Sequence, residues 1–208
     1  MSDLVIAFAG AIGSGKTTLS NAVCEALDCP RVGFGDYVRQ VARSRGLDDS
    51  RQVLQNVGAS LVDGGVDRLC RAVLSQADWR PGTSLVIDGV RHVEVMESLR
   101  RLVAPSELRL VFVAVDDPTR LSRLVTEDIA DKHDLDRVDD HSTEAQVRSA
   151  LPTIADLVVT GGGSPDELAA LILLRVQEWQ AAINTSQEPP VGNMPDSPSP
   201  RKPNTTIA

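Results

Sequence analysis

Aromatic residues are scarce in this chain, where Phe, Trp and Tyr together make up 3% of the 208 residues. Hydrophobic residues still account for 42%, so a core has to be built mainly from Val, Leu, Ala and Ile. The length suits one domain with a possible appendage. We expect one folded domain over residues 1–183 and a Pro- and Ser-rich, disordered tail over 184–208.

Cysteine is also rare. Cys24, Cys29 and Cys70 are odd in number, and their spacing fits no common zinc pattern. We interpret them as reduced thiols of a cytoplasmic protein, with Cys24 and Cys70 packed on helix faces. A metal or redox pair formed by Cys24 and Cys29 is the alternative.

An excess of positive charge and a long apolar run are both missing. The net charge of −8 argues against sequence-independent binding to nucleic acid polymers or to anionic membranes. A small basic pocket inside an acidic protein remains compatible with it. No run approaches the ~20 apolar residues of a membrane span, and the first apolar run is too short for a signal peptide. We therefore expect a cytoplasmic protein, monomer or homodimer, without a membrane partner.

The most informative motif is G-x-x-x-x-G-K-T, which follows a short apolar run at residues 4–9 and precedes a helical pattern. Strand, glycine-rich loop and helix are the context that a phosphate-binding loop needs, because backbone N–H groups and the helix N-terminus then surround an anion. Lys16 is predicted to reach the β- and γ-phosphates, and Thr17 to ligate Mg²⁺. The residues predicted to bind ATP are Gly10, Ala11, Ile12, Gly13, Ser14, Gly15, Lys16, Thr17 and Thr18. An ordinary glycine turn is the alternative.

Strand and helix patterns alternate along the rest of the chain. Further strands are expected at 31–35, 84–89, 108–115 and 157–160, and helices at 36–45, 50–77 with a break at 64–65, 94–103, from 116, 143–151 and 164–182. This alternation predicts a three-layer α/β fold with a five-stranded parallel sheet. Ligands of such sheets lie beyond the carboxyl ends of the strands, where Asp36, Asp88 and Asp116 fall. Asp88 is predicted to face the Mg²⁺.

Residues 126–141 hold seven acids against Lys132 and Arg137. We interpret this segment either as a solvated surface loop or as a mobile lid over about residues 124–142. A metal site at His133 and His141 is a weaker alternative, because their spacing fits no standard site. The helices at about 36–78 are expected to form a flap that binds the acceptor.

Phosphoryl transfer to a second phosphate needs cations for both substrates, and arginine suits this because its planar fork binds phosphate oxygens in pairs. The candidates are Arg39, Arg91, Arg123, Arg137 and Arg148. Each follows a strand end or borders the acidic segment.

Several short elements resemble the adenylate kinase family of P-loop kinases, in the family's order, over about residues 4–180. They are Gly35-Asp36-Tyr37-Val38-Arg39 for G-D-x-[LV]-R, Asp88-Gly89-Val90-Arg91 for D-G-F-P-R, Asp117–Arg123 for the helix before the lid, and Arg137-Val138-Asp139-Asp140 with Arg148 for R-x-D-D…R. The resemblance implies acceptor binding by Arg39 and Arg91, and catalytic roles for Arg123, Arg137 and Arg148. Asp36 is expected to bind and orient the acceptor, and Lys16 of the loop motif is expected to be catalytic as well.

Glu127 stands where adenylate kinases have a second lid arginine, and the glutamine that reads adenine has no equivalent. We therefore expect an acceptor other than AMP. The sequence favours ATP·Mg²⁺-dependent transfer to a nucleoside or deoxynucleoside monophosphate. Phosphorylation of dephospho-coenzyme A or another small molecule, and a nucleotide-binding regulatory module or slow NTPase, remain alternatives.

Overall fold

A computed structural model describes residues 4–126, 147–160 and 163–187. The described residues contain a five-stranded sheet with strand order β2-β3-β1-β4-β5, and every pair of neighbouring strands is parallel. The strands are β1 (Leu4–Ala9), β2 (Arg31–Gly33), β3 (Leu85–Val90), β4 (Glu107–Ala114) and β5 (Leu157–Thr160). The predicted parallel sheet is therefore confirmed, and its order places β1 in the centre.

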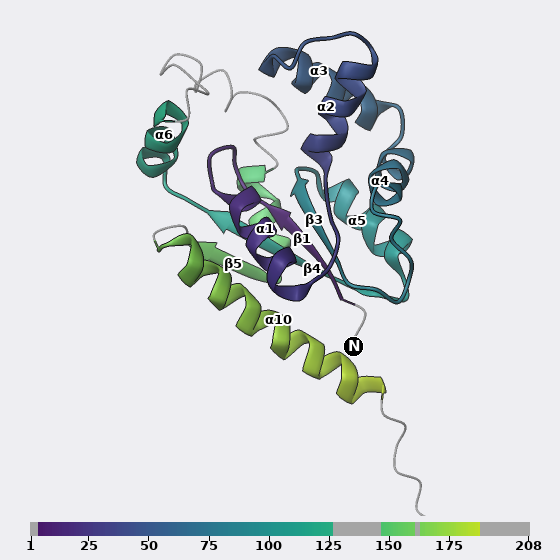
Figure 1. The fold of residues 1–208 in the computed structure, drawn as a ribbon, viewed down its shortest axis with the longest axis vertical. Coiled ribbons are helices and arrows are strands. Elements are labelled where there is room, and N and C mark those ends of the chain that lie inside the picture. Colours follow the sequence, from purple (N-terminus) through teal and green to yellow (C-terminus); the bar gives the residue numbers. More distant parts are fainter. Residues whose placement is uncertain (1–3, 127–146, 161–162, 188–208) are drawn as a thin grey trace, which may run out of the picture.

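The central strand is buried along its whole length, and its side chains divide between two cores. Val5, Ala7 and Ala9 join the core formed with α4 (Val66–Ser75) and α5 (Val93–Val103). Leu4, Ile6 and Phe8 join the core formed with α1 (Lys16–Leu27) and α10 (Pro165–Gln187). Because successive side chains of a strand point to opposite faces, a continuous apolar run is what a strand between two helical layers requires. Figure 1 shows the three layers.

The remaining helices lie mainly around the carboxyl end of the sheet. They are α2 (Phe34–Ser44), α3 (Arg51–Asp63), α6 (Asp117–Thr126) and the short α9 (Leu151–Ile154). Figure 1 shows α2 and α3 on one side of this end of the sheet and α6 on the other. The expected break at residues 64–65 separates α3 from α4, because Gly65 adopts a φ of 117°, which favours glycine.

Four details differ from the expected elements. The strand expected at 31–35 ends at Gly33, and α2 begins at Phe34, so Asp36 lies in the first helical turn and does not cap the helix. Phe34 is 8% exposed and packs in the core from the first position of the helix. The four-residue helix α9 was not expected. The last helix reaches Gln187, five residues beyond the expected end at Ala182, so the first residues assigned to the tail are helical.

Several predicted features lie outside the described residues. They are Glu127, Arg137, both histidines of the acidic segment, the start of the helix expected from 143, and the tail from residue 188 onward. Within the described residues, no helix is long and apolar enough to cross a membrane.

The three cysteines are free thiols. Cys70 is fully buried on α4, and Cys24 packs on α1, as predicted. Cys24 donates a hydrogen bond to the carbonyl of Cys29 over 2.7 Å. Burial, with the neighbouring Cys24, raises the pKa of the Cys29 thiol to about 12. Since the thiolate is the metal-binding and redox-active form, this environment argues against the metal or redox pair.

The start of α10 carries the predicted capping box. The amide of Glu167 donates to Ser164 Oγ at 3.2 Å, and the amide of Ser164 donates to Glu167 Oε2 at 3.0 Å. The hydrogen bond from Ser164 lowers the pKa of Glu167. The box satisfies amides that the first turn of a helix leaves without partners.

We predict that Ser164→Ala lowers the free energy of unfolding by about 1 kcal/mol, because an amide at the start of α10 loses its acceptor. Urea denaturation would measure the change. Ser75→Ala is the matched control, since Ser75 Oγ donates only to the carbonyl of Ala72 near the end of α4. The control should change stability by less than about 0.5 kcal/mol. Equal losses in both variants would contradict the capping role.

Candidate functional site

The phosphate-binding loop connects the end of β1 to the start of α1. Gly13 and Gly15 adopt φ angles of 78° and 85°, in the left-handed region that favours glycine. The amide of Ser14 donates to the carbonyl of Ala11 over 3.1 Å, which closes the turn. The loop thus lies at the carboxyl end of the central strand and at the N-terminus of a helix, where backbone amides and the helix dipole favour an anion.

The two side chains at the start of α1 have contacts that suit a nucleotide site. Lys16 Nζ donates to the carbonyl of Ala11 over 3.3 Å, so the ammonium group lies against its own loop. Thr17 Oγ1 donates to Asp88 Oδ2 over 2.8 Å. This direction of donation leaves the oxygen lone pairs of Thr17 available to a cation.

Asp88 lies on β3, opposite Phe8 of β1 on one side and Gly33 of β2 on the other. It is 6% exposed, and its Oδ1 is buried without a hydrogen-bond partner among the described residues. A buried carboxylate oxygen without a partner is costly unless a ligand satisfies it. Together, Asp88 Oδ1 and the Thr17 hydroxyl supply the hard oxygen atoms that Mg²⁺ prefers, so these residues fit the predicted metal.

Two cavities meet at the loop. The larger has a volume of about 680 Å³ and extends from Gly13, Lys16 and Thr17 to α2, α3 and the start of α5. The smaller, of about 360 Å³, extends over the same three loop residues toward α6 and the start of α10. Of the predicted ATP-binding residues, Ile12 lines the larger cavity, while Ser14, Gly15 and Thr18 line the smaller. A volume of several hundred cubic ångströms is the range of small-molecule sites.

The larger cavity is rich in cations. Arg39 and Arg91, the two arginines predicted to bind the acceptor, both line it, and Arg51 of α3 lines it as well. Apolar side chains complete the wall, among them Phe34, Val38, Leu54, Val62 and Val95. A basic cavity in a chain of net charge −8 is the arrangement that the composition left open, and it favours an anionic small molecule.

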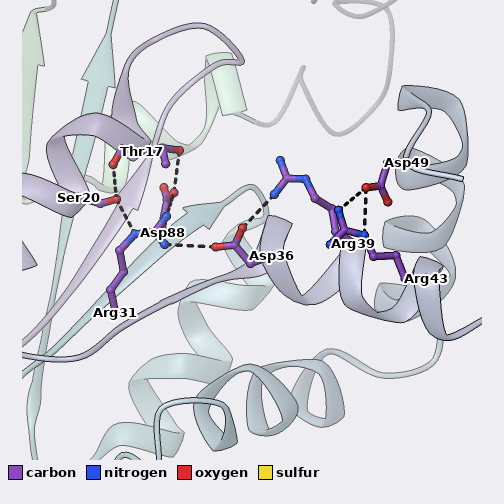
Figure 2. A network of polar contacts seen from close by, with 8 residues as sticks. All are labelled: Thr17, Ser20, Arg31, Asp36, Arg39, Arg43, Asp49 and Asp88. Carbon is purple, nitrogen blue, oxygen red and sulfur yellow. Dashed lines mark hydrogen bonds and ion pairs between the residues drawn. The ribbon is translucent and has the colours of Figure 1, made fainter.

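Asp36 does not line either cavity in the described residues. Its Oδ1 accepts from Arg39 Nη1 at 2.9 Å, and its Oδ2 accepts from Arg31 Nη1 at 3.2 Å. Figure 2 shows this carboxylate between the two arginines. Its contacts therefore suit orienting Arg39 better than touching the acceptor directly.

Arg123 and Arg148, both predicted to be catalytic, lie in different surroundings. Arg123 lines the smaller cavity, and its Nη1 donates to the carbonyl of Ser14 over 3.1 Å. Arg148 donates to Asp117 Oδ1 over 3.1 Å and lines neither cavity. The structure therefore brings Arg123 to the phosphate loop and does not bring Arg148 there. Arg137 lies outside the described residues.

Asp116, the third acid expected at the carboxyl ends of the strands, stabilises a helix start. Its Oδ1 accepts from the amide of Thr119 over 2.7 Å, directly before α6. This hydrogen bond lowers the pKa of Asp116.

Sequence reasoning missed three arginines near the site: Arg31, Arg51 and Arg120. Arg120 is 4% exposed and packs against Gly13 of the loop. Arg120 and Arg123 are one helical turn apart, a spacing that could have suggested a shared face. Arg51 shares a helical stripe with Leu54, Gln55 and Gly58, all of which line the larger cavity. No local pattern singles out Arg31, because Asp88, its buried partner, lies 57 residues away in the sequence.

Comparison with known proteins identifies the family and the fold of this chain. The AAA_18 family model, described as an AAA domain, matches residues 6–149. The chain belongs to this family. A UPF0200 protein of Aeropyrum pernix is 33% identical over 122 residues, which cover 59% of this chain and 64% of that protein, less than two thirds of its length.

Two further matches extend over most of the chain. A dephospho-CoA kinase of Sodalis glossinidius is 24% identical over 203 residues, covering 87% of this chain and 94% of that protein. The crystal structure of shikimate kinase from Acinetobacter baumannii superposes with a TM-score of 0.58 at 17% identity, covering 86% of this chain and 96% of that structure. The likeness to shikimate kinase is one of fold. These matches show the AAA_18 family and a fold that is shared with P-loop kinases.

No cluster of three or more His, Cys, Asp and Glu side chains that could hold a metal occurs in residues 4–126, 147–160 and 163–187.

We predict that Gly13→Ala weakens the binding of ATP·Mg²⁺ at least about tenfold. A Cβ at this position would lie 2.9 Å from Leu124 Cγ and would also meet Arg120, in a backbone conformation that disfavours a side chain. Isothermal titration calorimetry would measure the affinity.

Gly46→Ala is the matched control for this prediction. Its φ of 69° imposes a similar strain, but an added Cβ would meet nothing within 4 Å. Each variant should lose about 1–2 kcal/mol of stability from the backbone, while only Gly13→Ala should lose affinity. Unchanged ATP binding by Gly13→Ala would show that the loop does not cradle the phosphates.

Proposed function

We propose that the protein transfers the γ-phosphoryl group of ATP to a nucleoside or deoxynucleoside monophosphate. The observation that carries this proposal is that the two cavities share Gly13, Lys16 and Thr17. The smaller cavity then holds the nucleotide of ATP, with its triphosphate over the loop. The larger cavity holds the acceptor, and its phosphate meets the γ-phosphate above Lys16.

The cations on each side of the shared residues match the charges of this reaction. Arg39 and Arg91 bind the acceptor phosphate, and Arg51 supplies a further positive charge in the same cavity. Arg123 and Lys16 bind the phosphates of ATP on the other side. These side chains reduce the repulsion between two anions and hold an acceptor oxygen in line with the γ-phosphorus.

Transfer itself needs little covalent participation by the protein. An oxygen of the acceptor phosphate forms a bond to the γ-phosphorus, the bond from this phosphorus to the bridging oxygen breaks, and ADP leaves. Because the acceptor oxygen is already anionic, no strong general base is required. When bound, Mg²⁺ supplies charge neutralisation between the β- and γ-phosphates. Thr17 and Asp88 are the residues that would hold it, and Arg137 and Arg148 remain proposed contributors from the expected lid.

Transfer to dephospho-coenzyme A is the second candidate, which the Sodalis glossinidius relative favours. An acceptor hydroxyl would require a base to remove its proton, and Asp36 is the candidate base. Its contacts with Arg31 and Arg39 support an orienting role instead. A regulatory module or slow NTPase is the third hypothesis, under which ATP hydrolysis would respond to none of the acceptors.

We predict that one nucleoside or deoxynucleoside monophosphate stimulates ADP release from ATP·Mg²⁺ to a turnover of about 1–100 s⁻¹. Each common monophosphate, and dephospho-coenzyme A, would be tested singly, with Lys16→Ala as the inactive control. Stimulation by dephospho-coenzyme A alone would select the second candidate. No stimulation by any acceptor, despite ATP binding, would remove both kinase assignments for these acceptors.

With the acceptor that stimulates ADP release, Arg39→Ala should raise the KM for this acceptor at least about tenfold. The affinity for ATP should stay within about twofold, because Arg39 lines only the larger cavity. Steady-state kinetics with both substrates varied would separate the two effects. Arg45→Ala is the matched control, an exposed arginine directly after α2 that lines neither cavity. An unchanged acceptor KM in Arg39→Ala would remove Arg39 from the acceptor site.

Gly58 provides a test of the cavity that does not remove a charge. It lies within α3 on the cavity wall, and an added Cβ would approach only Val38, at 3.9 Å. Gly58→Ala should therefore fold well and keep activity, whereas Gly58→Leu should fill part of the cavity and raise acceptor KM at least about tenfold without changing ATP affinity. Equal kinetics for the two variants would place the acceptor elsewhere.

A further inference from the structure

Arg31, at the start of β2, contacts three separate parts of the site. Its Nη2 donates to Asp88 Oδ2 over 2.5 Å, its Nη1 to Asp36 Oδ2 over 3.2 Å and its Nε to Ser20 Oγ over 3.0 Å. Figure 2 shows the side chain between these partners, with Thr17 and Ser20 on one side and Asp36 on the other. One guanidinium thus connects β3, the first turn of α2 and the first two turns of α1.

The contact with Asp88 reaches the predicted metal site. Asp88 Oδ2 accepts from both Arg31 and Thr17, which leaves the buried Oδ1 for a cation. Ser20 is fully buried and donates to the carbonyl of Thr17 over 3.0 Å, so Arg31 also supports the turn that carries the other proposed metal ligand. A carboxylate that ligates a metal is commonly oriented by such hydrogen bonds.

The contact with Asp36 reaches the proposed acceptor site. Asp36 can approach Arg31 because Gly33 has no side chain: a Cβ there would lie 2.4 Å from Asp36 Oδ2. The other oxygen of Asp36 holds Arg39. The chain of contacts therefore runs from Thr17 through Asp88, Arg31 and Asp36 to an arginine that lines the larger cavity.

Arg31 itself lines neither cavity in the described residues, so its contribution has to pass through these carboxylates. Its side chain is 17% exposed, and that of Asp88 is 8% exposed. Between these two side chains a charged hydrogen bond is strong and poorly replaced. The Asp36 side chain is 54% exposed, so solvent screens its contacts with Arg31 and Arg39 more strongly. A lysine would keep the charge but could not hold two carboxylates and a hydroxyl in fixed directions, because only arginine has a planar fork of donors.

We propose that Arg31 is a positioning residue that couples the metal–nucleotide site to the acceptor-binding helix α2. Occupation of the metal site fixes Asp88, and Arg31 passes this restraint to Asp36 and the first turn of α2. Arg39 is then held ready before the acceptor arrives. The naming of Arg39 as the acceptor arginine rests on the proposed function, whereas the coupling itself can be measured without an acceptor.

Hydrogen–deuterium exchange with ADP as the probe tests this coupling. Peptides from the loop (residues 10–18) and from α2 (residues 34–44) would be followed with ADP in EDTA and with ADP in Mg²⁺. In the unmodified protein, Mg²⁺ should slow exchange in the α2 peptide at least about threefold, although α2 contributes no residue to the smaller cavity. Loop protection by ADP shows that nucleotide is bound.

Two variants break the coupling in different ways. Arg31→Lys keeps the charge and removes the fork. Gly33→Ala keeps every charge and displaces the Asp36 carboxylate, at a φ of −132° that any residue adopts. Both should lose the metal-dependent slowing in α2 and keep loop protection by ADP. Arg101→Lys is the matched control, since Arg101 of α5 pairs with Asp67 of α4.

The outcomes separate the coupling from the phosphoryl transfer. Metal-dependent slowing in α2 that persists in Arg31→Lys or in Gly33→Ala would overturn the coupling, as would its absence from the unmodified protein when the loop is protected. Loss of the response in Arg101→Lys as well would also overturn it. If the exchange experiment shows the coupling but no acceptor stimulates ADP release, only the proposed transfer would be overturned. Absence of ADP protection on the loop would overturn both.

Discussion

Burial of β1 on both faces is the constraint on which the site depends. Its alternate side chains enter two separate cores, so the strand has to lie in the middle of the sheet. After β1 the chain leaves the sheet at the carboxyl end of this strand, and the phosphate loop lies there. Gly13 then packs against α6, which follows the neighbouring strand β4. The loop's position thus follows from hydrophobic burial before any ligand is considered.

Opposite charges hold the site together in the absence of a ligand. The acidic chain places two of its carboxylates, Asp36 and Asp88, among the arginines that would otherwise repel one another. A buried charge without a partner is strongly unfavourable, so the contact of Arg31 with the buried Asp88 supports the fold, whereas the exposed Asp36 contributes less to stability. The contacts of the two carboxylates also set the directions in which Arg39 and Thr17 point before substrates bind. These contacts organise the site in advance, which is what the proposed phosphoryl transfer would require.

Sequence patterns predicted the elements well where local signals were strong. The fifth strand has the predicted bounds, and the capping box at Ser164 forms as expected. The patterns failed where packing decides. Phe34 sits between two glycines and looked like part of a strand, but its burial starts α2 two residues earlier than the predicted cap. The polar residues after Ala182 looked like a tail, yet Ile183 is 7% exposed and the helix continues beyond it.

The residues of the candidate site also fall into two groups, those that local motifs predicted and those that only the tertiary structure brought together. The sequence by itself determined the phosphate loop, the acid at the end of the third strand and two of the arginines that line the larger cavity, because each belongs to a short motif. Only the tertiary structure decided that Thr17 would meet Asp88, 71 residues away, and that Arg31 would join them to Asp36. The physical reason is the parallel sheet. It places β2 beside β3 and brings their carboxyl ends to the loop, so side chains without any common local pattern share one small, partly buried space.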